Sequence, residues 1–423
     1  MGYVISLVLA SIAYYKYKLD GNDLANPVTL FCGTWAIVTF MATLRLFNMI
    51  ETSNQAWLVI FTGAMFCVLG THAGGIVAER VRIVNRANSR IRDRINTNLV
   101  NGTVLILFIY YCYNLINTNV IENLISGNSL AYIRSQYVDQ FFYKVENPII
   151  TVVGTYVIAP LAYCITPLLI YRVIALNKKG ALVTVLALNI LDAITTGGRY
   201  GLFIMMFQFA VGTIIMRKRM PNRSLKEKKK VRKVIIVILI MLFFATISRL
   251  EEASQFVESM YMYLCGSVPH LSLRIGESIE PLYGMASLNG LISPLAFIAN
   301  NIGLHPYSND YLLFKQIIDM QAYYRIGPSM FINAYVTSFY YPYMDGGLFG
   351  VAFFMFAFGT GIGYVYRKMM TTMKIVYIVT YFIFAGMIFR TIIGYPFGSS
   401  DGVLGILFAL FMFKKVSGSD QKV

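Results

Sequence analysis

Apolar runs of about 18 to 20 residues recur along the chain, and short polar segments separate them. Each run is long enough to cross a hydrocarbon core of roughly 30 Å as a helix. Backbone groups in lipid must bond internally, and the runs lack the two-residue alternation of barrel strands. The expected crossings are residues 2–15, 27–44, 56–76, 98–115, 147–171, 181–196, 201–216, 234–247, 346–366, 375–393 and 402–413. The pattern predicts an all-α polytopic membrane protein with about eleven transmembrane helices.

Composition agrees with this class. Of the 423 residues, 57% are hydrophobic and 13% are charged, whereas roughly a quarter of the residues in an ordinary soluble domain are charged. The segment Met1–Tyr15 is apolar, has no basic start and is not followed by a small-residue cleavage site, so we expect a retained first helix. The five cysteines form no CxxC pair, which predicts neither a disulfide framework nor a zinc site.

The distribution of lysine and arginine predicts the orientation. Of these 36 residues, 27 fall in one set of alternating loops and 9 in the other. Loops rich in lysine and arginine stay in the cytoplasm, so the N-terminus is expected outside and the C-terminus inside. The basic run 217–233 is then a topology signal and a contact for anionic lipids, and nucleic acid is not an expected partner.

One external segment, residues 248–345, is much longer than the others, and connections of this length are usually functional. It separates an N-terminal bundle (1–247) from C-terminal helices with a short tail (346–423). Its apolar part, 282–299, is interrupted by two glycines and a proline. A re-entrant or interfacial pair of short helices is favoured there, because a full crossing would place the basic residues that follow outside.

Several nucleotide and metal motifs are absent. The chain has no GxxxxGK[ST], HExxH or DxD sequence and no His/Cys cluster, so no ATP-driven pump, metal or other cofactor is expected. Gly359, Gly361 and Gly363 lie inside an expected crossing. Close helix packing explains them better than a phosphate loop does.

Arginines at the outer ends of apolar runs are candidate binding residues, because membrane proteins bury arginine reluctantly. Arg199 lies in the glycine-containing turn Thr195–Gly201, and Arg390 ends an apolar run. Each arginine either binds an anionic group or simply extends to the membrane interface.

The long external segment gathers histidine, arginine and tyrosine. His270 and Arg274 are four residues apart and would share a helix face, which suits either a phosphate with a proton-transfer partner or a plain surface helix. His305 is either a base or a turn residue, and Arg325 is a candidate phosphate or sugar contact. Tyrosines such as Tyr324 suit either sugar rings or an interfacial aromatic belt.

Three short motifs give a family resemblance. The segment Asn333–Gly350 resembles the Asn-x-Tyr-Thr … Asp-x-Gly-x-x-Gly start of a late crossing in Wzy-type oligosaccharide repeat-unit polymerases, although Val336 interrupts its Tyr-Thr part. The turn Thr195–Gly201 is similar to their outer Gly/Ser-Arg motif. Ser129–Tyr137, which contains Arg134, is similar to their external Ile-Arg segment. The layout of crossings with one dominant late external loop resembles this family over nearly the whole chain.

The resemblance implies a GT-C-like fold and a reaction. These enzymes join oligosaccharides carried on undecaprenyl pyrophosphate at the outer face of the bacterial cytoplasmic membrane. The growing glycan leaves its lipid pyrophosphate and is transferred to a hydroxyl of a new lipid-linked repeat, without a metal. Arginine suits the charge of the leaving pyrophosphate, and a base must take the acceptor proton. The implied catalytic residues are His305, His270 and Asp345, and the implied substrate or pyrophosphate contacts are Arg199, Arg274, Arg325, Arg390, Arg134 and Tyr324.

The implied partners are the lipid-linked oligosaccharide, the bilayer, a chain-length regulator and a flippase. Two alternative functions stay open. An O-antigen-ligase-like transferase would use another acceptor, but the His-rich loop signature of such ligases is reduced here to His305. A lipid-linked oligosaccharide flippase or other transporter would need charged residues along a path through the membrane, and Asp192 comes nearest to that.

Overall fold

The structure, a computed structural model, describes residues 1–84, 92–117, 119–126, 148–196, 200–219, 255–276, 280–304, 323–332 and 336–416, with a few single positions between them. Within these residues, 7 helices are long and apolar enough to cross a membrane. They lie in Pro27–Leu44, Asn54–Arg80, Thr97–Asn117, Ile149–Leu176, Lys179–Thr196, Tyr200–Arg217 and Tyr340–Thr372. The protein is therefore an all-α multi-pass membrane protein.

Each predicted crossing within the described residues coincides with a helix. The first forms α1 (Gly2–Leu19), which is not one of the 7 helices above. The last two form the shorter α17 (Ile375–Arg390) and α18 (Ser400–Phe411). The predicted crossing 234–247 lies outside the described residues.

Two helices are longer than the hydropathy pattern predicts. The structure extends α3 over Asn54–Val84 and α16 over Tyr340–Thr372, where 56–76 and 346–366 are expected. The added turns contain charged and polar residues, among them Arg80 and Arg367. A hydropathy boundary falls at the first such residue, although arginine is a good helix former and the helix continues through it.

By internal packing the chain divides into two compact units, which are described separately. Unit 1 comprises Met1–Ile91, Val257–Tyr377 and Met387–Leu404, and unit 2 comprises Arg92–Phe256, Ile378–Gly386 and Gly405–Val423. Residues 1–247 therefore contribute to both units. The boundaries also divide α17 and α18 between them.

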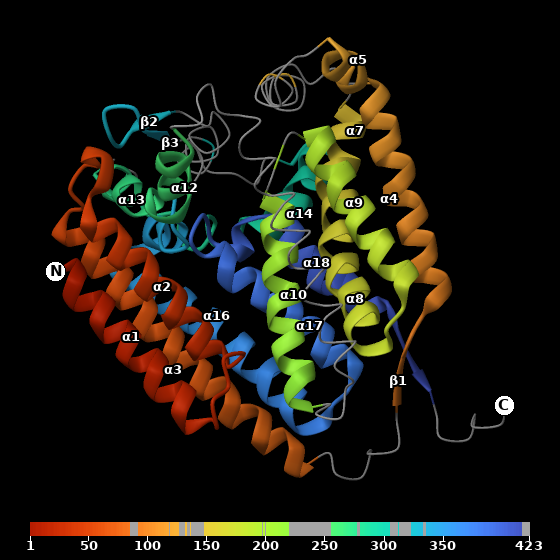
Figure 1. Ribbon diagram of the computed structural model, residues 1–423, viewed down its shortest axis with the longest axis horizontal. Coiled ribbons are helices and arrows are strands. Elements are labelled where there is room, and N and C mark those ends of the chain that lie inside the picture. Colours follow the sequence, from red (N-terminus) through yellow and green to blue (C-terminus); the bar gives the residue numbers. More distant parts are fainter. Residues whose placement is uncertain are drawn as a thin grey trace. The chain divides into compact units, whose positions relative to one another are not determined.

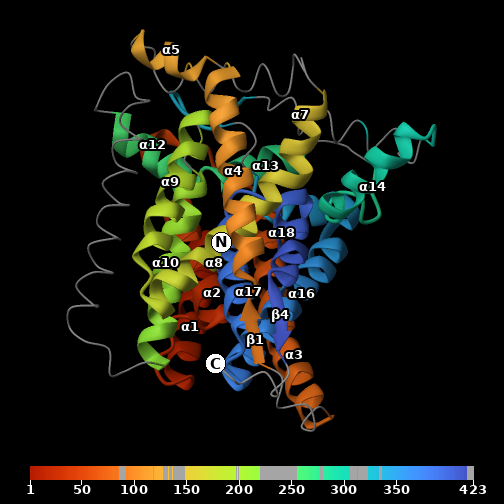
Figure 2. The same ribbon diagram turned by 90° about the vertical axis from the view of Figure 1, so that its right-hand side faces the viewer.

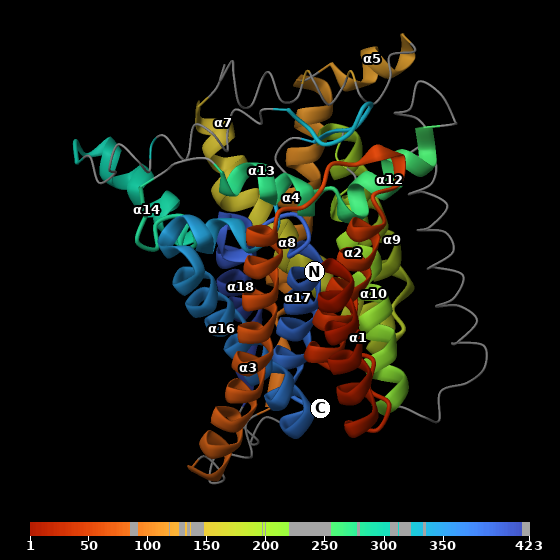
Figure 3. The same ribbon diagram turned by 90° about the vertical axis from the view of Figure 1, so that its left-hand side faces the viewer.

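Unit 1 is built on the pairing of α3 with α16, which lie side by side in Figure 3. A Cβ atom at Gly70 or Gly74 of α3 would overlap backbone atoms of α16, and one at Gly359 or Gly363 would overlap backbone atoms of α3. The predicted role of Gly359 and Gly363 in close packing is confirmed. α1 and α2 (Pro27–Leu44) pack beside this pair, and Figure 1 shows them next to α3.

The long predicted loop contributes short elements to one end of unit 1. These are α12 (Gln255–Cys265), α13 (Ser267–Ile275) and the hairpin of β2 (Tyr324–Arg325) with β3 (Phe331–Ile332). The Tyr261 hydroxyl donates to Met41 O (2.6 Å) and accepts from Leu46 N (3.1 Å), and Ile50 N donates to Ile326 O (2.8 Å). These bonds attach the loop elements to the connection between α2 and α3.

The segment 282–299 begins with turns at 283–288 and continues as α14 (Asn289–Asn301). Its 13 residues are fewer than the roughly 20 that a crossing needs. Asn289 Nδ2 donates to Gly398 O (2.7 Å) in the turn η5 (Pro396–Gly398), and Gly290 lies so close to η5 that a Cβ would overlap its backbone. Figures 2 and 3 show α14 extending sideways beyond the end of α16.

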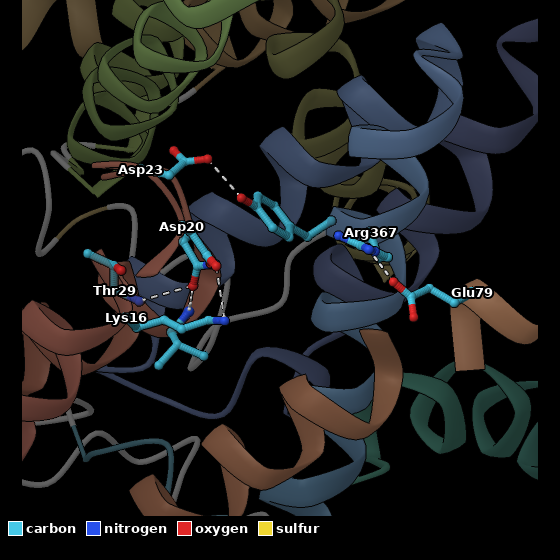
Figure 4. Close-up of polar contacts among 9 residues, drawn as sticks. Lys16, Asp20, Asp23, Thr29, Glu79 and Arg367 are labelled. Carbon is cyan, nitrogen blue, oxygen red and sulfur yellow. Dashed lines mark hydrogen bonds and ion pairs between the residues drawn. The ribbon is translucent and has the colours of Figure 1, made fainter. Parts of the chain in front are cut away.

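The opposite ends of α1, α3 and α16 carry a second set of polar contacts (Figure 4). Lys16 Nζ lies 3.2 Å from Asp20 Oδ1, and Tyr366 donates to Asp23 Oδ2 over 2.8 Å. Arg367 forms an ion pair with Glu79. In unit 1, the described residues of the loops that the charge pattern assigns to the cytoplasm therefore lie at one end, and the described residues of the loops that it assigns to the outside lie at the other.

Unit 2 contains α4 (Thr97–Asn117), α8 (Ala159–Leu176), α9 (Lys179–Thr196) and α10 (Tyr200–Arg219), which pack against one another. The apolar helix that ends with α8 starts as α7 (Pro148–Val153) and passes through a π-helical turn. That turn ends two residues before Pro160, whose missing N–H disturbs the regular hydrogen-bond ladder.

Three short elements of unit 2, one helix and two strands, have no counterpart in the predicted pattern. The helix α5 (Val120–Ile125) follows α4. The strands β1 (Arg92–Ile95) and β4 (Phe413–Val416) pair antiparallel, and Asn96 N donates to Met412 O (2.9 Å) beside them. This pairing holds the start of α4 beside the end of α18.

Candidate functional site

His270 and Arg274 lie one turn apart on α13 and share a face, as their spacing predicts. Gly266 starts the helix, and its carbonyl accepts from His270 N over 3.2 Å. The two side chains are almost fully buried, with 1% and 2% exposed. They face the interior of unit 1, so a plain solvent-facing surface helix does not describe α13.

Two tyrosines complete a cluster around these residues. Arg274 Nη1 donates to the hydroxyl of Tyr324 in β2. The Arg274 guanidinium lies 5.0 Å from the ring centre of Tyr324 and 5.2 Å from that of Tyr340, the first residue of α16. The rings of His270 and Tyr324 are 4.9 Å apart. We call these four residues the His270–Arg274 cluster.

The cluster joins α13, the β2–β3 hairpin and α16. A guanidinium over an aromatic ring contributes about 0.5–2 kcal/mol, and more when water is excluded. Imidazole, guanidinium and phenol together can transfer a proton and bind an anion. His270 and Arg274 are almost fully buried, so the cluster lies inside unit 1 and not on its surface.

The exposed side chains of the same hairpin include Tyr323 and Arg325. Arg325 Nε donates to Gly327 O (3.2 Å), and its Nη2 donates to Pro328 O (3.0 Å). The arginine therefore closes the hairpin turn while part of its side chain stays accessible. Ser329 in this turn donates to Glu258 of α12, which ties the turn to the helix before α13.

Asp345 lies elsewhere in unit 1 and contacts backbone. One carboxylate oxygen accepts from Ala286 N (3.0 Å) and the other from Ser287 N (2.7 Å). Leu282 N and Tyr283 N donate to carbonyls at the same turn of α16. Asp345 thus holds the segment before α14 against α16, a structural task that the sequence pattern does not indicate.

Arg390 is also separate from the cluster and contacts Asp401. Arg390 Nη1 donates to Asp401 Oδ2 over 2.7 Å. Asp401 Oδ1 also accepts from Gly402 N (2.9 Å) at the start of α18. Sequence reasoning missed Asp401, although the Ser-Asp-Gly sequence before an apolar run is a typical helix start.

Three predicted site residues, His305, Arg199 and Arg134, lie outside the described residues, as do Asn333–Tyr335 of the resemblance motif. The described part of that motif breaks α16 at Gly346 and Gly347, and the φ of Gly347 is 58°. Glycine adopts this angle without strain. A Cβ at Gly350 would overlap Pro342 O, so the last motif glycine allows the kinked turn to close.

Within the part of the chain that the structure describes, no three His, Cys, Asp or Glu side chains are grouped so that they could hold a metal ion.

In comparisons with known proteins, no family model, no curated protein and no solved structure matches this chain. The fold defines the class, an all-α multi-pass membrane protein that occupies a lipid bilayer.

Proposed function

We propose that the protein polymerises undecaprenyl-pyrophosphate-linked oligosaccharide repeats at the outer face of the bacterial cytoplasmic membrane, as Wzy-type polymerases do. The observation that carries the proposal is the His270–Arg274 cluster. Residues from the long loop segment form it against α16, at the end of unit 1 that the charge pattern assigns to the outside.

In this proposal the donor is a glycan on lipid pyrophosphate, and the acceptor is a hydroxyl of a second lipid-linked repeat. A linkage to pyrophosphate is already activated, so the transfer needs neither ATP nor a metal. Arginines stabilise the leaving pyrophosphate by bidentate hydrogen bonds. We assign this role to Arg199, with Arg274, Arg134, Arg325 and Arg390 as further candidates, and sugar packing to Tyr324 and the exposed Tyr323.

The same proposal includes the membrane topology. We assign about eleven crossings in a GT-C-like arrangement, an external N-terminus and a cytoplasmic C-terminus. Among the predicted bases, Asp345 is the least suited to proton transfer, because both of its carboxylate oxygens accept backbone N–H groups. A chain-length regulator and a flippase would act beside the protein.

An O-antigen-ligase-like transferase and a lipid-linked oligosaccharide flippase remain the alternatives. Glycan analysis of a strain that lacks the gene separates the three. A polymerase predicts accumulation of single lipid-linked repeats on the outer face of the membrane. Single repeats confined to the inner face would support the flippase, and intact polymer that stays on its lipid would support the ligase; either result refutes the proposal.

A further inference from the structure

Unit 2 contains a polar cluster inside its apolar helices that the histidine and arginine assignments do not use. Its centre is Asp192 of α9, four residues before the helix ends at Thr196. At 1.5 Å per residue, the carboxylate lies about 6 Å along the axis from that end. Ionisable side chains in membrane helices are costly, and those that occur generally serve a function.

Asn189 of α9 lies one turn away from Asp192 on the same face. Its amide Nδ2 donates to Val185 O (2.8 Å) and to Thr166 Oγ1 of α8 (3.4 Å). A Cβ placed on Gly201, in the first turn of α10, would lie 3.3 Å from Asp192 Oδ2 and 3.7 Å from Asn189 Oδ1. Two side-chain oxygens therefore converge on a position that carries no side chain.

A tyrosine from a third helix also lies near the carboxylate. Tyr110 of α4 interacts electrostatically with Asp192 and forms a hydrogen bond with Asn114. A Cβ on Gly154 would overlap the Tyr110 hydroxyl, and Gly154 begins the π-helical turn Gly154–Ile158. π turns within helices frequently mark functional sites. This observation is independent of the convergence on Gly201.

We propose that Asp192 is the proton acceptor of the transfer reaction, an inference that rests on the proposed function. The acceptor hydroxyl oxygen forms a bond to the anomeric carbon of the donor glycan. The bond from that carbon to the phosphate oxygen breaks, and its electron pair leaves with the lipid pyrophosphate. The hydroxyl proton moves to the Asp192 carboxylate and then to water.

Two sequence features agree with this role. Arg199, the proposed pyrophosphate contact, follows Asp192 by only seven residues in the sequence. Asp192 is one turn from the helix end that the charge pattern assigns to the outer face, where a sugar hydroxyl is available.

A structural role for Asp192 is separable from a chemical one. A carboxylate beside the first turn of α10 could cap that helix. Asparagine caps a helix about as well as aspartate, but it cannot take a proton. Asp192→Asn therefore keeps the cap and removes the base.

The experiment uses the purified full-length protein and a lipid-linked repeat unit as substrate. We expect Asp192→Asn to lower turnover by about 100-fold or more while the affinity for the repeat and the melting temperature stay near wild type. Asp192→Ala leaves room for a small carboxylate, and added formate should restore part of its turnover. Glu122→Gln, which changes an exposed carboxylate of α5, is the matched control and should have no effect.

Wild-type turnover in Asp192→Asn would overturn the inference. So would loss of substrate affinity or melting temperature in that variant combined with no formate rescue of Asp192→Ala. If the wild-type protein itself forms no polymer, the proposed function fails instead, which is a distinguishable result.

Discussion

The guanidinium of Arg390 donates a 2.7 Å hydrogen bond from Nη1 to Oδ2 of Asp401, and the two side chains are only 16% and 26% exposed. The pair joins the end of α17 to the start of α18 within unit 1. A pyrophosphate at Arg390 would compete with this carboxylate. Arg390 thus contacts a carboxylate, whereas Arg325 on the hairpin donates to the backbone carbonyls of Gly327 and Pro328.

Removal of one member of the Arg390–Asp401 pair should destabilise unit 1, because the other charge is left partly buried. Arg390→Gln and Asp401→Asn should each lower the melting temperature in detergent. The double variant should lose less unfolding free energy than the two single variants lose together. The difference, which is the coupling free energy, should be roughly 1–3 kcal/mol. Arg45→Gln removes an exposed ion pair with Glu51 and should change stability by less than about 0.5 kcal/mol. Additive effects at Arg390 and Asp401 would contradict the account.

Neighbouring glycines on α3 provide a matched pair for the packing against α16. A Cβ at Gly74 would overlap Thr360 O, whereas a Cβ at Gly75 would meet no atom within 4 Å. Gly74→Ala should destabilise the protein by about 1–3 kcal/mol, because the helices must separate. Gly75→Ala should be neutral or stabilising, because alanine favours a helix. Equal melting temperatures for the two variants would exclude this packing role.

The helix α14 should lie in the membrane–water interface on the outer side of the cytoplasmic membrane. Leu291, Leu295, Ile298 and Ile302 are exposed along one side, while the small residues opposite are buried. No residue in 281–304 is charged. A nitroxide attached at Leu295→Cys should report a depth near the headgroup–acyl boundary, about 5–10 Å into the membrane. A label at the bilayer centre, or one fully in water, would disprove this placement.

Cys265, the native cysteine of the long loop segment, is buried and should react little in such labelling. Burial raises the pKa of Cys265 in α12 to about 12, so its thiol stays protonated at neutral pH. Membrane-impermeant maleimide added to intact cells should reach cysteines engineered at Ser126 and Asn309, but not one at Ser224. The uneven distribution of lysine and arginine predicts this result. Protection of the Asn309 site would refute the predicted topology.

Helices and their approximate ends follow from the sequence because the hydrophobic pattern is local. The spacing of His270 and Arg274 likewise predicts their shared face, since both lie on one short helix. The partners Tyr324 and Tyr340 are about 50 and 66 residues from Arg274 in the chain. Local patterns carry no information about such contacts, so the tyrosines appear in the sequence only as part of an aromatic-rich region.

Asp345 is a second residue whose contacts cannot be predicted from the sequence. As a loop carboxylate next to glycines, it has the composition of a candidate base. Its two backbone contacts depend on the path of 284–287, which tertiary packing determines. Asp192 shows the converse, because a single carboxylate in an apolar run is visible in the sequence, while its convergence with Asn189 on Gly201 is not.

The polymerisation assay tests the central claim most directly. Purified protein in lipid vesicles is given a single lipid-linked repeat, and the products are separated by length. We expect a ladder of longer lipid-linked glycans from the wild type, none from Arg199→Ala, and little from Arg199→Lys, because an ammonium lacks the bidentate fork of a guanidinium. A wild-type protein that leaves the repeats single, or that only moves them across the bilayer, would contradict the account.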